Sequence, residues 1–355
     1  MVTALKTSIN ILLVFLFAAC TSVPDERMTP YVDFPETREL TARTLSLDSA
    51  LFRYPYRVRV QDDKAVVLDL HGTEYFFHAF HYPGFHYLSS FGKRGDAPEE
   101  MLSAENLRWN GNFLWTLDSN KSELTRLGFA SSGDSLLRLE AVSLDEELLR
   151  ALDFVQYDDS TFIIPDYSGD SRFCLVSRQG KLLHKIGTIP TTDEDALKNA
   201  HPALAQAWRS FIDYNPRNGV LAAVTQLGEV LEIYNLKDST HIVRIGPNGE
   251  PEFQISQGYG IPTGIMGFSD IQVTDSAIYV VFQGRAFKDI MQKAQQGINL
   301  PDGGQNIYVF SLEGKPLRKY VLDHYIHGIS VDEQKSIIIA TDVNKDEPII
   351  EYKLL

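Results

Sequence analysis

Oxygen-bearing side chains recur near the ends of the strands that this sequence predicts, and they are the first candidates for chemistry. The candidate polar set comprises four of them, Asn106, Asp153, Asp270 and Asp342, together with the imidazole of His327. Hard cations such as Ca²⁺ take about six to eight oxygen ligands, and a bound cation could activate water against a lactone or an ester. No spacing singles these residues out, so a calcium-dependent hydrolase is one alternative and the identity of any metal is left open.

Histidine chemistry has less support. His71, His78, His81 and His86 lie close together among aromatic residues. His78 and His81 would face opposite sides of one strand because an odd number of positions separates them. Aromatic packing is therefore the better interpretation. The sequence also lacks a Gly-x-Ser-x-Gly elbow and a phosphate-binding loop. We predict no catalytic residue, and no cofactor beyond the open question of calcium.

The N-terminus predicts export. Lys6 precedes an apolar run, Ile9–Ala19, that is too short for a stable membrane span. The run ends in small residues before Cys20, which resembles a bacterial lipobox. We expect residues 1–19 to be a lipoprotein signal peptide and Cys20 to carry the lipid that binds the membrane. The alternative is an ordinary secretory peptide that is cleaved nearby.

The cysteine count and the net charge argue against two further kinds of function, thiol chemistry and nucleic-acid binding. The only other cysteine, Cys174, lies in a β-like apolar run and is interpreted as a packed hydrophobic residue. The 355 residues carry a formal net charge of −14, which would repel phosphate backbones. We therefore expect no nucleic-acid partner.

One strand pattern recurs six times after residue 50. Each copy is an apolar strand followed by Asp or Gln, and these polar residues are 48 to 60 positions apart: Asp69, Asp118, Asp166, Gln226, Gln283 and Asp342. This spacing is typical of four-stranded propeller blades. The sequence predicts an all-β, six-bladed β-propeller, with the polar set at the mouth of its channel. The repeated Asp and Gln are better explained as groups that bond backbone N–H in their own turns.

The ends of the chain should close the ring. The last repeat stops at Leu355 without an outer strand, and Ala42–Leu51 offers one, with Leu45, Leu47 and Leu51 on one face. We expect residues 20–40 to form a lipid-anchored tether, because they are polar and contain three prolines. Residues 41–355 would then form the propeller.

Three segments depart from the repeat. Residues 191–210 have helical spacing, with Thr192 available as an N-cap. Gly284–Gln305 interrupts the fifth blade with a helical insertion. Gln254–Phe268 is aromatic and amide-rich, and is either a partner-binding segment or a crossover between blades. The last two segments supply the candidate partner-binding residues: Tyr259, Met266, Phe268, Arg285 and Phe287.

With this lipobox and six repeats, the segments Phe91–Gly95, Ile307–Pro316 and Glu347–Tyr352 resemble the TolB-like six-bladed propeller lipoproteins of Gram-negative gut anaerobes. The likeness covers about residues 40 to 355. Glycine after the outer strands is also similar to NHL-type propellers. These motifs mark blade geometry, so the resemblance implies a fold and a lipid-anchored envelope location, periplasm-facing or at the cell surface, and no catalytic residues.

The sequence favours a non-enzymatic binding or scaffolding propeller for a protein, peptide or glycan. Its most adaptable contact would be the insertion Gly284–Gln305, because blade closure does not require it. The calcium-dependent lactonase or esterase stays the alternative.

Overall fold

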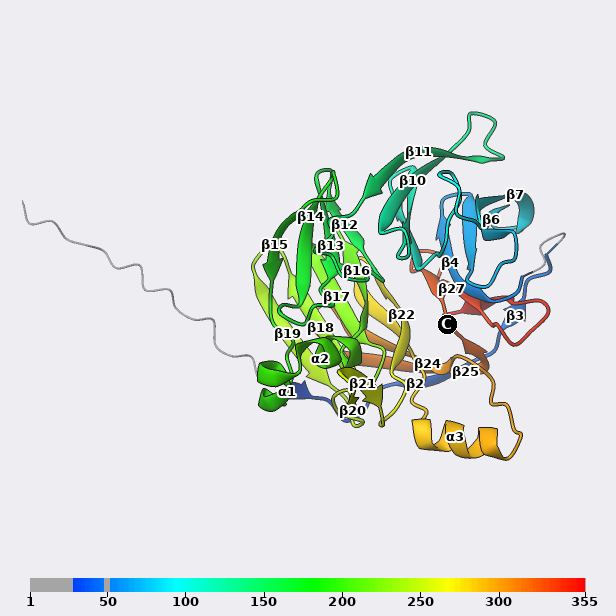
Figure 1. Cartoon of the computed structure of the whole chain (residues 1–355). Coiled ribbons are helices and arrows are strands. Elements are labelled where there is room, and N and C mark those ends of the chain that lie inside the picture. Colours follow the sequence, from blue (N-terminus) through cyan, green and yellow to red (C-terminus); the bar gives the residue numbers. More distant parts are fainter. Residues whose placement is uncertain (1–27, 48–51, 355) are drawn as a thin grey trace, which may run out of the picture.

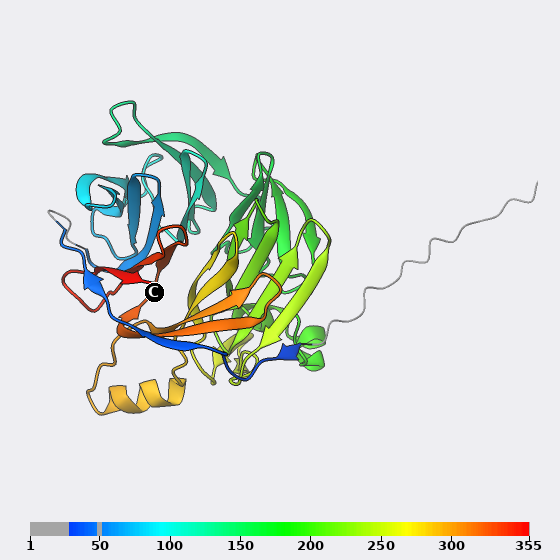
Figure 2. The ribbon, with the colours of Figure 1, turned by 180° about the vertical axis from the view of Figure 1, so that it is seen from behind.

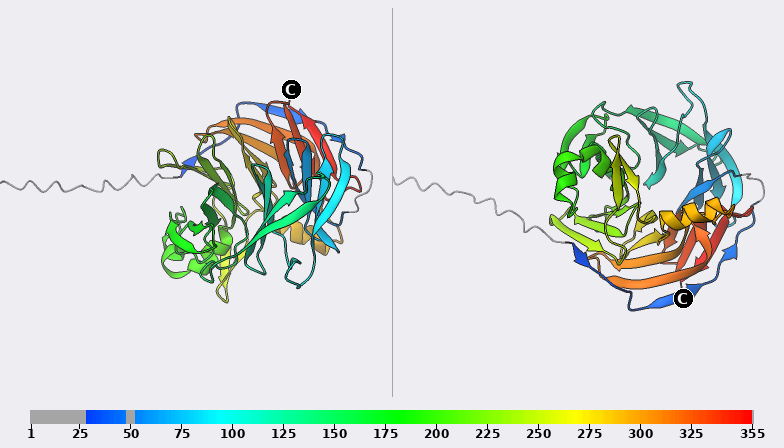
Figure 3. Two further views of the ribbon diagram at one scale, coloured as in Figure 1. Left: turned by 90° about the horizontal axis from the view of Figure 1, so that it is seen from above. Right: turned by 60° about the horizontal axis from the view of Figure 1, so that its bottom comes forward.

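The computed structural model describes residues 28–47 and 52–354. The predicted signal peptide, Cys20 and Leu51 lie outside the described residues. The described chain forms a ring of six β-sheets (Figure 1 and Figure 3). Within each sheet the strands follow chain order from the centre outward, except that an N-terminal strand forms the outer edge of three sheets. This is the predicted six-bladed propeller.

The first three blades each contain four antiparallel strands. Blade 1 is β4 (Pro55–Gln61), β5 (Lys64–Asp69), β6 (Tyr75–His81) and β7 (His86–Lys93). Blade 2 is β8 (Asn106–Asn110), β9 (Phe113–Asp118), β10 (Glu123–Phe129) and β11 (Leu136–Ser143). Blade 3 is β12 (Val155–Asp158), β13 (Thr161–Pro165), β14 (Phe173–Ser177) and β15 (Leu182–Ile186).

The last three blades each gain a strand from the N-terminal segment. Blade 4 is β16 (Ser210–Asn215), β17 (Val220–Thr225), β18 (Val230–Asn235) and β19 (Thr240–Ile245), followed by β1 (Thr29–Pro30). Blade 5 is β22 (Phe268–Val273), β23 (Ala277–Phe282), β24 (Gly304–Ser311) and β25 (Pro316–Ile326), followed by β2 (Thr37–Leu40). Blade 6 is β26 (Ile329–Asp332), β27 (Ile337–Thr341) and β28 (Ile349–Lys353), followed by β3 (Arg43–Thr44).

Strand β3 supplies the missing outer strand of blade 6. It pairs antiparallel with β28, and the Leu45 N–H extends the pairing by donating to the Ile349 carbonyl at 2.9 Å. This agrees with the closure that the sequence predicts. Paired edges also leave fewer backbone groups open to association.

The expected tether is shorter than predicted. Within residues 20–40, β1 and β2 pair parallel with β19 and β25, and Figure 2 shows this blue segment running along the outside of the ring. Tyr31, Phe34 and Leu40 are buried there. Packing these apolar side chains against the blades stabilises the docked segment. A tether can therefore extend only as far as Met28. The sequence prediction was wrong here because residues 20–40 are polar overall, and these few apolar residues are isolated within them.

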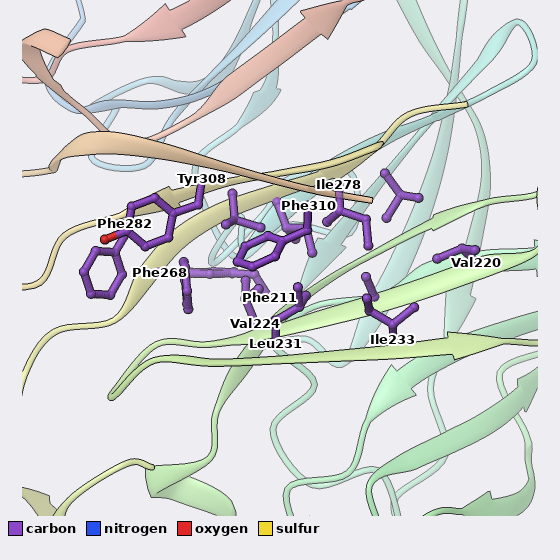
Figure 4. Packing of buried hydrophobic residues seen from close by; sticks show 14 of the residues in the cluster. Phe211, Val220, Val224, Leu231, Ile233, Phe268, Ile278, Phe282, Tyr308 and Phe310 are labelled. Carbon is purple, nitrogen blue, oxygen red and sulfur yellow. The ribbon is translucent and has the colours of Figure 1, made fainter. Parts of the chain in front are cut away.

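The core lies between neighbouring blades. The second strands β17 and β23 are buried along their whole length, as expected for strands covered on both faces, whereas no residue of the outer strand β15 is buried. Figure 4 shows the cluster that joins blades 4 and 5, in which Phe268, Phe282 and Tyr308 pack together. Cys174 is buried in a similar cluster of blades 2 and 3, which confirms it as a packing residue.

Two of the segments that depart from the repeat are helical, as predicted, but the first contains two helices instead of one. Residues 191–210 form α1 (Glu194–Asn199) and α2 (His201–Ala207) rather than one helix. Pro202 lies in the first turn of α2, and its missing N–H prevents a continuous helix. The N-cap of α1 is Asp193, whose side chain accepts from Ala196 N at 2.9 Å; the predicted cap, Thr192, instead donates to Glu250. The insertion in blade 5 contains α3 (Phe287–Gln295).

Residues 254–268 prove to be a crossover between blades 4 and 5, built around the hairpin β20 (Phe253–Ser256) and β21 (Tyr259–Pro262). Among the described residues, no helix is long and apolar enough to cross a membrane.

Candidate functional site

The ring has two unlike ends. The first strand of every blade runs from the end that carries α1, α2, the β20–β21 hairpin and α3 (Figure 1), which we call the insertion end. It runs toward the short turns that join the first and second strands, which we call the turn end. Polar residues that emerge from the first strands at the turn end must converge on the channel.

A cavity of about 410 Å³ occupies the turn end. Every blade contributes to its lining through its first strand: Arg59, Arg108, Tyr157, Tyr214, Gln272 and Ser330. A space that all six blades line must lie on the axis of the ring. We call it the turn-end pocket, and its volume falls in the range of about 300–1,000 Å³ that is usual for small-ligand sites.

Buried ion pairs close the floor of this pocket. Arg57 donates through Nε to Asp270 Oδ1 at 2.9 Å, and Arg59 donates through Nη2 to the same oxygen at 2.8 Å. Asp270 also accepts from Ile329 N at 2.9 Å. The side chains of Arg57 and Asp270 are each only 1% exposed. One carboxylate thus joins β4, β22 and β26 across the channel.

A second group of ion pairs crosses the other half of the floor. Arg108 reaches Asp153 at 3.1 Å and Asp213 at 2.6 Å. Asn106 also donates to Asp153 at 2.5 Å, and Asp153 accepts from Ile212 N at 2.9 Å. Here one guanidinium serves two carboxylates, the reverse of the arrangement at Asp270.

The two arrangements shift carboxyl pKa values in opposite directions. Burial alone would raise the pKa of Asp270, but Arg57 and Arg59 together hold it well below its usual value. Burial raises the pKa of Asp213, because the opposing charge of Arg108 does not compensate. The floor thus contains three arginines and three aspartates, which balance in number.

Aromatic rings form the wall of the pocket. Tyr157 and Tyr214 lie in adjacent blades with ring centroids 5.5 Å apart, and both are partly exposed. Trp109 is also half-buried in the wall and stacks on Phe129 at 6.3 Å. Such rings offer an apolar face for a ligand to pack on.

The structure divides the predicted polar set into two groups along the channel. Asn106, Asp153 and Asp270 belong to the floor network. His327 lies toward the insertion end with Tyr54 and Asp302, and Asp342 bonds His324 at 2.7 Å. Within residues 28–47 and 52–354, no three His, Cys, Asp or Glu side chains are grouped so that they could hold a metal.

Three of the repeated strand-end aspartates confirm the turn interpretation for their own blades. Asp118 accepts from the backbone N–H of Asn120 and Lys121 at 3.0 Å each. Asp166 bonds Ser168 N, and Asp342 bonds Asn344 N, in the same way. Asp69 differs, because its carboxylate accepts from Arg53 N and Tyr54 N, which lie well before its own turn. The structure thus shows the local turn role for three of the six repeats.

The predicted partner-binding residues share the insertion end, with one exception. Tyr259 is 60% exposed on the hairpin, and Phe287 begins α3 half-buried. Backbone bonds bring the two segments together: Met266 N donates to the Arg285 carbonyl at 2.8 Å. Arg285 itself donates to the Gly303 carbonyl at 2.6 Å and holds the insertion loop.

The prediction that Phe268 contacts a partner is wrong. Only 1% of it is exposed, because its ring fills the core between blades 4 and 5 (Figure 4). A partner cannot contact it.

Sequence reasoning missed the arginines of the pocket floor. Arg57 and Arg59 are two positions apart in β4, so both side chains point to the same side. In the first strand of a blade that side faces the axis, and this alternation was the available signal.

A family model described as TolB-like 6-blade propeller-like matches residues 33–334. A putative exported protein from Bacteroides fragilis is 10% identical, with a TM-score of 0.58, over 91% of this chain and 99% of that chain. A duf4221 family member from Bacteroides vulgatus is 10% identical, with a TM-score of 0.55, over 89% and 96%.

An auxiliary nutrient binding protein from Bacteroides ovatus is 9% identical, with a TM-score of 0.54, over 88% of this chain and 76% of that chain. At these identities the likeness is one of fold. A comparison with curated proteins finds no match.

Proposed function

The chain belongs to the TolB-like six-bladed propeller family, and from that premise we propose that it is a non-enzymatic binding protein of the cell envelope that holds a neutral glycan in the turn-end pocket. The observation that carries the proposal is the 410 Å³ cavity to which all six blades contribute. A rigid ring holds these side chains in place before a ligand arrives, which lowers the entropic cost of binding.

The chemistry of the lining supports a sugar. A pyranose presents C–H groups on its faces and hydroxyls around its edge. The partly exposed rings of Tyr157 and Tyr214 suit the faces, while amides and carboxylates such as Gln156 and Asp158 border the same cavity and suit the hydroxyls. The charges of the floor are paired, and the chain carries −14 overall, so an anionic ligand would gain little.

The hydrolase alternative has no comparable support. Asp153 and Asp270, two of its proposed oxygen ligands, are both bonded to guanidinium groups. A calcium ion would have to displace these arginines and leave their charges buried without partners, which is costly.

The envelope location rests on the sequence. Cys20 after the apolar run is the proposed lipid attachment point. Replacing it, Cys20→Ser, should move the protein from the membrane fraction to the soluble fraction, and the wild type should incorporate a fatty-acid analogue. Wild-type protein that incorporates none would contradict the anchor.

The glycan proposal is tested by calorimetry with short neutral oligosaccharides. The double variant Tyr157→Ala/Tyr214→Ala should bind at least about fivefold more weakly, because each lost ring contact is worth about 0.5–1.5 kcal/mol. Tyr259→Ala removes an exposed tyrosine at the opposite end and should bind as the wild type does. Equal binding by all three proteins, or no binding by the wild type, would contradict the proposal.

A further inference from the structure

We propose that the insertion end of the ring lies against the lipid bilayer, with α3 and the β20–β21 hairpin as the surfaces that enter the lipid interface. The inference deepens the proposed function and rests on its lipid anchor at Cys20. It concerns how the propeller is oriented on the membrane, which the anchor alone does not specify.

Helix α3 has an apolar stripe that the described protein covers only in part: Phe287 and Ile290 are half-buried, whereas Met291 and Ala294 are exposed. Phe287, Ile290, Met291 and Ala294 recur at the spacing of one helix face. None of the nine residues of α3 is buried, and Met291 is 62% exposed. Helices of globular proteins normally bury such a stripe, so the exposed part of this one is suited to another apolar environment.

The charges of α3 are placed as in helices that lie in a membrane interface. At 100° per residue, Lys288 and Lys293 fall on opposite flanks of the apolar stripe. Long lysine side chains in this position can extend to the headgroups while their stems stay in the apolar layer. Amphipathic helices with this distribution lie in the plane of the bilayer surface.

The hairpin presents a second apolar surface at the same end. Gly260 N donates to Gln206 Oε1 at 3.1 Å, and a Cβ at Gly260 would come within 2.5 Å of the Ala203 carbonyl oxygen. This close contact fixes one face of the hairpin on α2. Tyr259 and Ile261 alternate with Gly260 and point to the other face, where they are 60% and 47% exposed.

The place where the described chain begins favours a lipid surface as the occupant. Met28 packs against the cluster that contains α1 and α2, at the insertion end. Cys20 is eight positions earlier in the sequence, so a fully extended chain would place it at most about 29 Å from Met28. A lipid on Cys20 therefore keeps the bilayer close to this end, where α3 and the hairpin lie. The turn-end pocket would face away from the membrane, open to its ligand.

Fluorescence on the lipidated full-length protein in phosphatidylethanolamine/phosphatidylglycerol vesicles tests the orientation. Met291→Cys carries an environment-sensitive fluorophore at the insertion end. Leu139→Cys, which replaces a similarly exposed apolar residue (47%) on β11, is the matched control. Cys174 is buried and does not compete for the label. Mass spectrometry measures the lipid on Cys20 independently.

The expected result is emission at position 291 that shifts to shorter wavelength and is quenched by brominated lipid, with no change at position 139. Lipidated protein whose position 291 is not quenched would overturn the orientation and leave the anchor intact. Position 291 protected from aqueous iodide but not quenched by lipid would show that a second copy of the chain covers α3, and would also overturn it. Protein without lipid on Cys20 would overturn both proposals.

Discussion

Replacing Asp270 by asparagine should destabilise the whole propeller. The carboxylate is 1% exposed and pairs with both Arg57 and Arg59. Asparagine keeps the shape but leaves two guanidinium groups in the channel without a counter-charge. Removing one partner of a buried ion pair costs about 3–5 kcal/mol. With an unfolding entropy of about 2.1 cal/mol/K per residue, a chain of this length should lose about 4–7 °C in Tm.

The penalty should also depend on pH in a defined direction. The pKa of Asp270 is held below its unfolded value. Its contribution is therefore fully present above the unfolded pKa of about 3.9 and is lost as pH falls through the folded pKa. The stability difference between wild type and Asp270→Asn should stay constant above about pH 5 and narrow below about pH 4.

Urea unfolding followed by circular dichroism measures this difference. The matched control is Asp275→Asn, the same chemical change at an exposed ion pair with Arg217 (2.6 Å; 49% and 74% exposed), which should cost at most about 1 kcal/mol. Equal penalties for the two variants at pH 7 would refute the reasoning. A penalty at Asp270 that grows as pH falls would refute the sign.

Three further outcomes are expected. Leu45→Ala, in the segment that closes the ring, should lower the free energy of unfolding by about 2–4 kcal/mol in urea titrations, because the side chain is 92% buried; a change below about 1 kcal/mol would argue against closure as a source of stability. Asp193→Ala removes the N-cap of α1 and should cost about 1 kcal/mol by the same measurement, whereas Thr192→Ala should leave the cap bond intact. In a Cys20→Ser background, Cys174 should resist iodoacetamide at pH 8 until urea unfolds the protein, because burial raises its pKa to about 12; alkylation of the folded protein, detected by mass, would contradict this.

The local repeat could be predicted from the sequence. Each blade carries an apolar second strand that is buried in the sheet, and a polar residue that ends it. Asp118 shows why this works: it bonds the backbone N–H groups of Asn120 and Lys121, two and three positions later. An interaction with near neighbours leaves its signature in the spacing of residue types. The closing strand at Arg43–Thr44 was also predictable, because an incomplete blade requires a partner for its open edge.

The candidate pocket depended on contacts between distant parts of the chain. Arg57 and Asp270 are 213 positions apart, and Arg108 and Asp213 are 105 apart. Each residue type is common on a protein surface, so neither its identity nor its local spacing indicates a buried partner. For the same reason Phe268 was predicted to be a contact residue, although neighbouring blades enclose it.

The sequence by itself determined the blade repeat, the closing segment and the lone buried cysteine, because these depend on strand alternation and turn chemistry over a few residues. Only the tertiary structure decided which charges neutralise one another, which aromatic rings stay exposed and which end of the ring carries the pocket. Those outcomes depend on how six sheets are placed around one axis, and the burial of a charge or a ring is defined only after that placement.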